Sequence, residues 1–279
     1  MAAHVPREVL SLDWIFPIQY ERDWVVSWQP EFCHESMSMA VLICGVYCAL
    51  CFIGRRIMRD FKPFQLKGPL ALWNLGLAVF SAIGASRTVP FLLINIYKYG
   101  IYDSVCAPPT PNYGRGPAAL WIVLFIFSKV PELADTVFIV LRKKPLIFLH
   151  WYHHITVLLF CWHAFGTRSA SGIYFIAMNY SVHAVMYFYY FLTACGYRPR
   201  WARLVTIFQL SQMGVGVAVC GLNVYYMKHG YACSVDPESL KWGIIMYSSY
   251  FALFLKFFVE RYLLRSAKKA AVAPAKKAQ

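Results

Sequence analysis

Four of the five histidines in the long apolar stretches of this 279-residue chain stand at spacings that bring them to shared helix faces. The fifth, His163, lies near the far end of its stretch and is set apart from them. His150, His153 and His154 stand at offsets of three and four residues, which places three imidazoles on one side of a helix. His183 lies in a later apolar stretch and shares its face with the amide of Asn179. A single histidine in such a stretch is usually a hydrogen-bonded packing residue, whereas a group of four indicates a reaction centre. Imidazole can move protons, bind a metal or accept an acyl group.

A lysine and two acidic residues occupy another apolar stretch. Lys129, Glu132 and Asp135 follow one another at intervals of three, which puts them on one side of a helix. Glu132 and Asp135 are the only two of the 13 acidic residues that lie deep in an apolar stretch. A salt bridge that settles helix packing would explain the group as well as a role in chemistry, and the spacing alone leaves both open.

Further polar side chains follow the same helical periodicity. Tyr187 and Tyr190 share the face of His183, and the next apolar stretch carries Gln209 and Gln212 three residues apart. Polar and ionisable groups are expensive in a membrane and usually mark a functional interior. Asn179, Tyr187, Gln209 and Gln212 are therefore candidate hydrogen-bond donors to a reacting oxygen.

The elements that carry these residues are predicted to span a membrane. Apolar residues make up 59% of the chain and charged residues only 14%, against about 25% charged in soluble proteins. Several apolar runs approach the length of about 20 residues that crosses a bilayer. We expect an all-α integral membrane protein with seven spans, near residues 37–53, 70–89, 118–141, 146–165, 171–194, 204–227 and 242–259. The apolar stretch 90–99 either extends the second span or lies at the interface.

The basic residues predict how the chain is oriented. Of the 27 Lys and Arg residues, 17 fall on one side of the predicted spans and 7 on the other. The positive-inside rule then places the C-terminus in the cytosol and the N-terminus in the lumen. We expect the membrane to be that of the endoplasmic reticulum. The same rule accounts for the net charge of +14, so we expect no nucleic acid partner.

Three segments follow from this orientation. We expect a lumenal N-terminal segment at 1–36 without a cleaved signal peptide, a seven-span domain at 37–264 and a basic cytosolic tail at 265–279. The tail carries Lys276 and Lys277, which resemble a dilysine retrieval signal, although lysine-rich ends are often merely solvated. Of the nine cysteines, Cys33, Cys106 and Cys233 are lumenal, where a disulfide can persist. A bridge between Cys106 and Cys233 would join the lumenal loops after the second and sixth spans.

Taken together, these motifs resemble the very-long-chain fatty acid elongase (ELO) family. The resemblance covers about residues 66–258, and the motifs occur in the family's order: Lys129…Glu132…Asp135-Thr136, His150…His153-His154, His183…Met186-Tyr187…Tyr189-Tyr190 and Thr206…Gln209…Gln212. In the stretch around His150 the sequence is similar to the branch that elongates saturated and monounsaturated chains, since many elongases of polyunsaturated chains have Gln at this position. The resemblance implies six helices in a barrel around an apolar tunnel, with the first helix outside. The Cys106–Cys233 bridge also fits the family's pattern.

The resemblance implies a 3-ketoacyl-CoA synthase, which condenses malonyl-CoA with a long-chain acyl-CoA and releases CO2 and CoA. The condensation needs no cofactor. Its implied partners are the 3-ketoacyl-CoA reductase, 3-hydroxyacyl-CoA dehydratase and enoyl-CoA reductase that finish each elongation cycle, and a homodimer is possible within the family.

The family's chemistry suggests a role for each candidate residue. His153 would accept the acyl group, and His183 would assist the reaction of the malonyl thioester. His150 and His154 would orient this pair, and the carboxylates near Lys129 would fix imidazole tautomers by accepting N–H bonds. CoA phosphates would meet basic residues at the cytosolic mouth, although positive-inside topology explains these equally well: Arg142, Lys143, Lys144, Arg198, Arg200 and Arg203.

Two other classes of protein compete with this interpretation. A membrane di-iron desaturase or hydroxylase also has histidine boxes, but it needs about eight histidine ligands, and the chain has eight histidines of which three are lumenal. A seven-helix receptor or small transporter would share the number of spans. Against this second class, the polar residues gather near the cytosolic half, and the chain lacks the inverted repeats with broken helices that many transporters show.

Overall fold

The computed structural model describes residues 13–264 of the chain. The predicted retrieval signal at Lys276 and Lys277 lies outside them, as do the outer parts of the two terminal segments. Within the described residues the regular structure is helical, and β-pairing is confined to an isolated bridge between Val25 and Arg115.

Each predicted span coincides with helical structure. In a bilayer, backbone N–H and C=O groups must be satisfied within the segment, so long apolar runs fold as helices. The elements are α3 (Met37–Ala49), which continues through η2 (Leu50–Gly54), α4 (Arg55–Ile57) and η3 (Met58–Asp60), then α5 (Lys67–Cys106), α7 (Gly116–Ser128), α8 (Ala134–Leu141), α9 (Phe148–Gly166), α10 (Gly172–Ala194), α11 (Ala202–Lys228) and α12 (Pro237–Phe258), which continues into η5 (Val259–Leu264).

Four of these helical segments are long and apolar enough to cross a membrane by themselves, namely Met37–Asp60, Lys67–Cys106, Ala202–Lys228 and Pro237–Leu264. The chain is thus a multi-pass membrane protein. The stretch 90–99 extends the second span, because α5 runs on through Pro90 and is interrupted only by non-helical backbone at Gly100, where φ is 77°.

The third predicted span differs from a continuous helix. α7 ends at Ser128, and a turn at Lys129 leads into the 3₁₀ segment η4 (Pro131–Leu133) before α8 begins. Pro131 has no backbone N–H and its ring crowds the preceding turn, which explains the break. The interruption places Lys129 and Glu132 on a tight turn, whereas Asp135 lies on α8.

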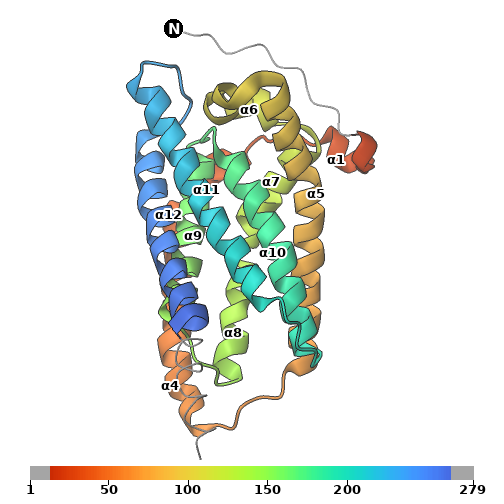
Figure 1. Cartoon of the computed structure of the whole chain (residues 1–279), viewed down its shortest axis with the longest axis vertical. Coiled ribbons are helices and arrows are strands. Elements are labelled where there is room, and N and C mark those ends of the chain that lie inside the picture. Colours follow the sequence, from red (N-terminus) through yellow and green to blue (C-terminus); the bar gives the residue numbers. More distant parts are fainter. Residues whose placement is uncertain (1–12, 265–279) are drawn as a thin grey trace, which may run out of the picture.

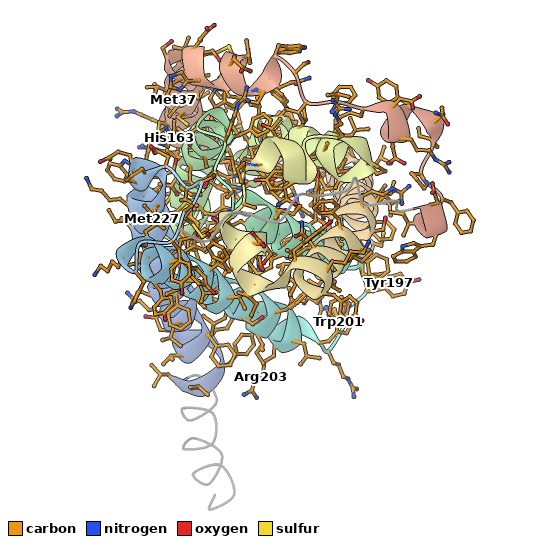
Figure 2. The ribbon with its side chains drawn as sticks, turned by 90° about the horizontal axis from the view of Figure 1, so that it is seen from above. Met37, His163, Tyr197, Trp201, Arg203 and Met227 are labelled. Carbon is orange, nitrogen blue, oxygen red and sulfur yellow. A yellow bond between two sulfur atoms is a disulfide. The ribbon has the colours of Figure 1, made fainter. Side chains whose placement is uncertain are left out.

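Six of the helices contact one another in a closed order (Figure 1). α5 contacts α10, α10 contacts α11, α11 contacts α12, α12 contacts α9, α9 contacts α7, and α7 contacts α5 again. α3 packs against α9, and a view along the long axis shows Met37 of α3 and His163 of α9 on the same side of the molecule (Figure 2). The ends of the molecule are named here after the short helices α6 (Pro109–Tyr113) and α4, which lie at the top and bottom of Figure 1.

Covalent and backbone bonds join the loops at the α6 end. Cys106, the last residue of α5, forms a disulfide with Cys233 in the loop before α12. Next to it, the Ser234 amide donates to the Cys106 carbonyl at 2.8 Å, and the Ala170 amide donates to the Ser234 carbonyl at 2.9 Å. The loops that follow α5, α9 and α11 are therefore held as one layer.

The N-terminal segment lies across this layer. Residues 13–35, called here the strap, comprise η1 (Asp13–Ile15), α1 (Gln19–Asp23) and α2 (Gln29–Glu35). Glu21 anchors the strap: it is 4% exposed, and it accepts hydrogen bonds from Trp121 Nε1 at 2.6 Å and from Arg87 Nε at 3.1 Å. Burial acts to raise the pKa of Glu21, but the hydrogen bonds from Arg87 and Trp121 lower it below its ordinary value.

We predict that the Glu21 anchor makes stability depend on pH in the acid range. Because its pKa is lowered by folding, its contribution is fully present above the ordinary pKa of 4.5 and is lost as pH falls through the folded-state value. In detergent, Glu21→Gln should lower the free energy of unfolding at neutral pH by about 1–3 kcal/mol and flatten the acid dependence. The exposed Glu238→Gln serves as the control, and an unchanged acid profile in Glu21→Gln would contradict the prediction.

Candidate active site

The polar centre of the molecule is built on the break between α7 and α8. Lys129 Nζ lies 2.8 and 3.0 Å from the two carboxylate oxygens of Glu132, and these residues are only 3% and 5% exposed. A 3₁₀ turn has three residues per turn, so it brings side chains three apart directly over each other. The ammonium also lies 3.9 Å from the centre of the Phe125 ring. The Lys129–Glu132 pair is thus enclosed in apolar surroundings.

Asn179 connects this ion pair to His183. Its Oδ1 accepts from Lys129 Nζ at 3.4 Å, and its Nδ2 lies 3.2 Å from His183 Nε2. Since lysine can only donate, the amide must present its oxygen to Lys129 and its NH2 group to the imidazole. His183 Nε2 is then the acceptor, and the proton of the neutral ring lies on Nδ1, which is 4.0 Å from Glu132 Oε2.

The three imidazoles of α9 gather on the facing side. The rings of His150 and His154 lie 4.5 Å apart and those of His153 and His154 5.8 Å apart, between centroids. His153 lies 4.9 Å from the Tyr250 ring of α12 and within electrostatic range of His183. Its Nδ1 atom is buried, and no hydrogen-bond partner is found for it within residues 13–264. The structure therefore brings the four predicted histidines into one region and leaves a nitrogen of His153 unengaged.

A residue that the sequence analysis missed connects α3 to this region. Tyr47 is 3% exposed, and its hydroxyl lies 2.7 Å from Thr136 Oγ1, which in turn lies 2.8 Å from His150 Nε2. Tyr47 stands in an otherwise apolar span, where a buried hydroxyl needs a partner. Its hydroxyl was the available signal, although no periodicity connects residue 47 to residue 150.

Asp135 departs from its predicted role. The prediction that the carboxylates accept N–H bonds from imidazoles is not met in the geometry. Asp135 instead accepts from Trp73 Nε1 at 2.6 Å and from the Tyr187 hydroxyl at 2.7 Å. Glu132 accepts from Lys129 and from Ser128, and its distance of 4.0 Å to His183 Nδ1 is too long for a hydrogen bond. The carboxylate oxygens are instead hydrogen-bonded to stronger or nearer donors on α5, α7 and α10.

The other predicted donors make no hydrogen bond to an imidazole within the described residues, although the Tyr187 ring packs 5.3 Å from the His183 ring. The Tyr187 hydroxyl is engaged by Asp135, and Gln209 Nε2 donates to Met186 Sδ at 3.1 Å. Gln212 is buried on α11, whereas Tyr190 is 42% exposed and packs beside the Tyr187 ring. Among the described residues, no hydrogen bond joins Gln209, Gln212 or Tyr190 to an imidazole, so Asn179 is the predicted donor that the structure places at the histidines.

The predicted CoA-binding residues lie in two turns. Arg142, Lys143 and Lys144 directly follow α8, and Lys143 Nζ donates to the Arg59 carbonyl beside α4 at 2.8 Å. A second basic group lies in the turn between α10 and α11 and at the start of α11, with exposed side chains: Arg198, Arg200 and Arg203. These residues are accessible to an acidic ligand.

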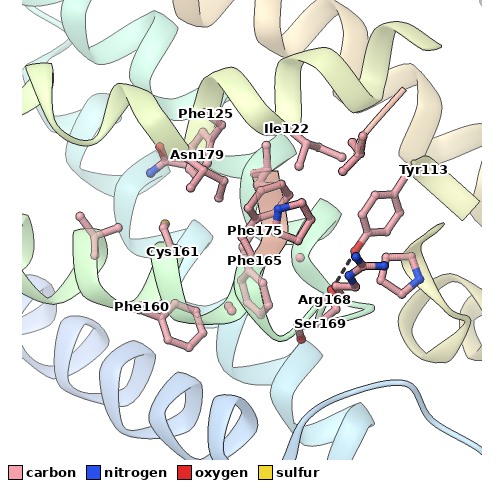
Figure 3. Close-up of a pocket in the computed structure, with 18 of the residues that line it drawn as sticks. Tyr113, Ile122, Phe125, Phe160, Cys161, Phe165, Arg168, Ser169, Phe175 and Asn179 are labelled. Atoms are coloured by element: carbon pink, nitrogen blue, oxygen red, sulfur yellow. Dashed lines mark hydrogen bonds between the residues drawn. The ribbon is translucent and has the colours of Figure 1, made fainter. Parts of the chain in front are cut away.

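An apolar chamber leads from the polar centre towards the α6 end (Figure 3). Its empty volume is about 1000 Å³, including the part open to solvent. Asn179 lies at its inner end, and apolar side chains of α7, α9, α10 and α12 form its walls, among them Phe125, Phe160, Cys161, Phe175 and Tyr247. An extended apolar molecule fits this shape, with one end at Asn179, the neighbour of His183.

Across residues 13–264, no group of three or more His, Cys, Asp or Glu side chains is arranged to hold a metal ion. His163, which the sequence analysis set apart from the site, indeed lies elsewhere, with Nε2 3.9 Å from Asp236 Oδ1.

We predict that the Lys129–Glu132 pair is required as a pair. Removing one partner of a buried ion pair leaves the other charge unpaired and destabilises the folded protein by about 3–5 kcal/mol. Lys129→Met should therefore lower the free energy of unfolding in mixed micelles by about that amount. Lys129→Met combined with Glu132→Gln should recover a substantial part of it. If the double variant is less stable than Lys129→Met alone, Glu132 does not depend on Lys129.

Comparisons with known proteins agree with the family resemblance of the motifs. The model of the ELO family, described as the GNS1/SUR4 family, matches residues 32–270. A protein named very long chain fatty acid elongase 6 from Gallus gallus is 42% identical over 264 residues, which is 93% of this chain and 97% of the relative. Proteins of the same name from Homo sapiens and Drosophila melanogaster are 40% and 42% identical, over 94% and 90% of this chain and 98% and 80% of the relatives. The chain belongs to the ELO family of very-long-chain fatty acid elongases.

Proposed function

We propose that this chain is a 3-ketoacyl-CoA synthase that condenses malonyl-CoA with long-chain saturated or monounsaturated acyl-CoA, the first step of the microsomal elongation cycle. One observation carries the proposal: Asn179, at the inner end of an apolar chamber, joins the buried Lys129–Glu132 pair to His183, and the three imidazoles of α9 lie in the same region. The chamber suits an acyl chain, and the imidazoles are where its thioester would lie.

In the first half-reaction, a ring nitrogen of His153 attacks the thioester carbonyl of the acyl-CoA. The carbon–sulfur bond breaks, CoA thiolate leaves, and the imidazole holds the acyl group. The buried, unpartnered Nδ1 of His153 is available for this attack. The apolar chamber keeps water from hydrolysing the acyl-imidazole.

In the second half-reaction, malonyl-CoA loses CO2, and the resulting enolate carbon attacks the acyl carbonyl. The new carbon–carbon bond forms as the bond between the acyl carbon and the His153 nitrogen breaks. The ring proton lost on acylation goes to the CoA thiolate, and the departing imidazole takes up a proton from water. His183 faces this step with Asn179 and the Lys129 ammonium behind it. A fixed positive charge and an amide donor stabilise negative charge on the enolate oxygen. The products are 3-ketoacyl-CoA, CO2 and CoA.

The membrane arrangement follows from the same proposal. The six helices in closed contact form a barrel around the acyl chamber, and α3 lies outside it. The α4 end, with Arg142, Lys143 and Lys144, faces the cytosol and receives CoA, whereas the α6 end faces the lumen of the endoplasmic reticulum. The disulfide at the α6 end suits an oxidising compartment. The reductases and dehydratase of the cycle take the product onward, and the condensation itself needs no cofactor.

The condensation is tested directly with the purified protein. Incubated with palmitoyl-CoA and labelled malonyl-CoA in the presence of EDTA, the wild type should yield 3-ketooctadecanoyl-CoA. His153→Ala should abolish the product, because the acyl acceptor is gone. His163→Ala, on the same helix but away from the imidazole group, is the matched control and should retain activity within about twofold.

Intact mass spectrometry tests the covalent step. Wild type incubated with palmitoyl-CoA alone should gain the mass of one palmitoyl group, and His153→Ala should not. Absence of the ketoacyl product from the wild type across a range of chain lengths would refute the proposed reaction.

We further predict that Tyr47 positions His150. Tyr47→Phe removes the hydroxyl that contacts Thr136 and should lower kcat about fivefold, since one hydrogen bond contributes about 1 kcal/mol. The KM for malonyl-CoA should stay near the wild-type value, because Tyr47 does not line the chamber. Tyr97→Phe, at a residue that is 90% exposed, is the control. Equal kcat in the two variants would show that the Tyr47–Thr136 contact has no part in turnover.

A further inference from the structure

At the α6 end the chamber is lined by parts of the chain that lie outside the helix ring. Val26 and Pro30 of the strap line it there, together with Pro109 and Thr110 of α6. The other end of the chamber is Asn179, which contacts His183. A chain held at the imidazoles therefore points its far end at the strap.

The distance along α9 from His153 to the strap matches the length of a long acyl chain. The α9 residues that line it, including Val157, Cys161 and Ala164, continue the helix face of His153 towards the strap. From His153 to Gly166, where α9 ends, the helix advances 13 residues, which is about 20 Å at about 1.5 Å per residue. An extended hydrocarbon advances by about 1.25 Å per carbon, so about 16 carbons fill this distance.

The strap is a fixed wall. The Val26 amide donates to the Gly114 carbonyl at 2.9 Å, and the Gly116 amide donates to the Trp24 carbonyl at 2.9 Å. Arg168, in the turn after α9, pairs with Glu31 of the strap. α2 approaches the end of α9 so closely that a Cβ on Gly166 would lie 3.0 Å from the His34 backbone nitrogen.

Adjacent strap residues face opposite ways. The backbone around Val25 is extended and pairs with Arg115, so successive side chains point to opposite sides. Val26 lines the chamber, whereas Val25 is 46% exposed. This alternation supplies a matched pair of positions on the same piece of backbone.

We propose that the strap, through Val26 and Pro30, is the end wall of the chamber and sets the longest acyl chain that the protein elongates. The inference rests on the proposed condensing function, since it assigns the far end of the same chamber. It makes a segment outside the helix ring, remote from the imidazoles, the determinant of substrate length.

The test compares Val26→Trp with Val25→Trp over saturated acyl-CoAs from dodecanoyl to eicosanoyl. Val26→Trp should shorten the longest accepted chain by about two to four carbons. For the longest substrate of the wild type, kcat/KM should fall at least about tenfold, whereas dodecanoyl-CoA should be used within about twofold of the wild-type rate. Val25→Trp should keep the wild-type profile. A Val26→Trp protein that folds and keeps the wild-type profile would overturn the proposal.

A second measurement uses the wild type alone and needs no turnover. Palmitoyl-CoA with a photoreactive diazirine on its terminal carbon is bound, irradiated and mapped by mass spectrometry. Label on the strap peptide that contains Val26 and Pro30 supports the wall, and label confined to α9, α10 or α12 overturns it. The results distinguish a failure of the proposed condensation from a failure of the proposed end wall. A wild type that binds the probe at the strap but forms no 3-ketoacyl-CoA contradicts the condensation, whereas an active wild type labelled only deep in the ring contradicts the wall.

Discussion

The ammonium of Lys129 and the carboxylate of Glu132 are held at 2.8 Å among apolar helices, and much of the site follows from that enclosure. Neither charge can be left alone there, because an unpaired ion in a low-dielectric interior loses its hydration without compensation. The pair also has spare hydrogen-bonding capacity, which Asn179 and Ser128 take up. Because Lys129 takes the amide oxygen of Asn179, the NH2 group of Asn179 faces His183 and selects the tautomer of its ring. The electrostatics of one turn thus orient a side chain on another helix.

The break between α7 and α8 shows which side-chain contacts sequence periodicity can predict and which it cannot. The interval of three between Lys129 and Glu132 predicted their contact, and a 3₁₀ turn satisfies that interval even better than an α-helix does. Asp135 had the same spacing, but it lies beyond the break, where a new helix begins. Its direction is therefore set by α8 and its partners are Trp73 and Tyr187. A local irregularity at Pro131 divided one predicted triad into two environments.

The helical spans and the histidine group were predictable for a shared physical reason. Lipid requires closed backbone hydrogen bonding, so apolar runs become helices, and helical periodicity then decides which imidazoles share a face. Periodicity says nothing about partners on other helices. The contact of Tyr47 with Thr136 joins residues 89 apart in the chain, and that of Glu21 with Trp121 joins residues 100 apart. Such contacts depend on packing, which one sequence does not display.

The separation between the polar centre and the strap determines which properties of the protein a substitution in each part can alter. His150 is hydrogen-bonded to Thr136 of α8, and His183 to Asn179, which also binds the buried Lys129. Substitutions there therefore disturb several partners at once. The strap is held mainly by backbone hydrogen bonds, by the Glu21 anchor and by one ion pair at the surface. Side chains such as Val26 can therefore vary in size while the backbone that carries them stays in place. On the proposed function, the identity of the reaction and the length of its substrate then reside in different parts of the fold, about 20 Å apart along α9.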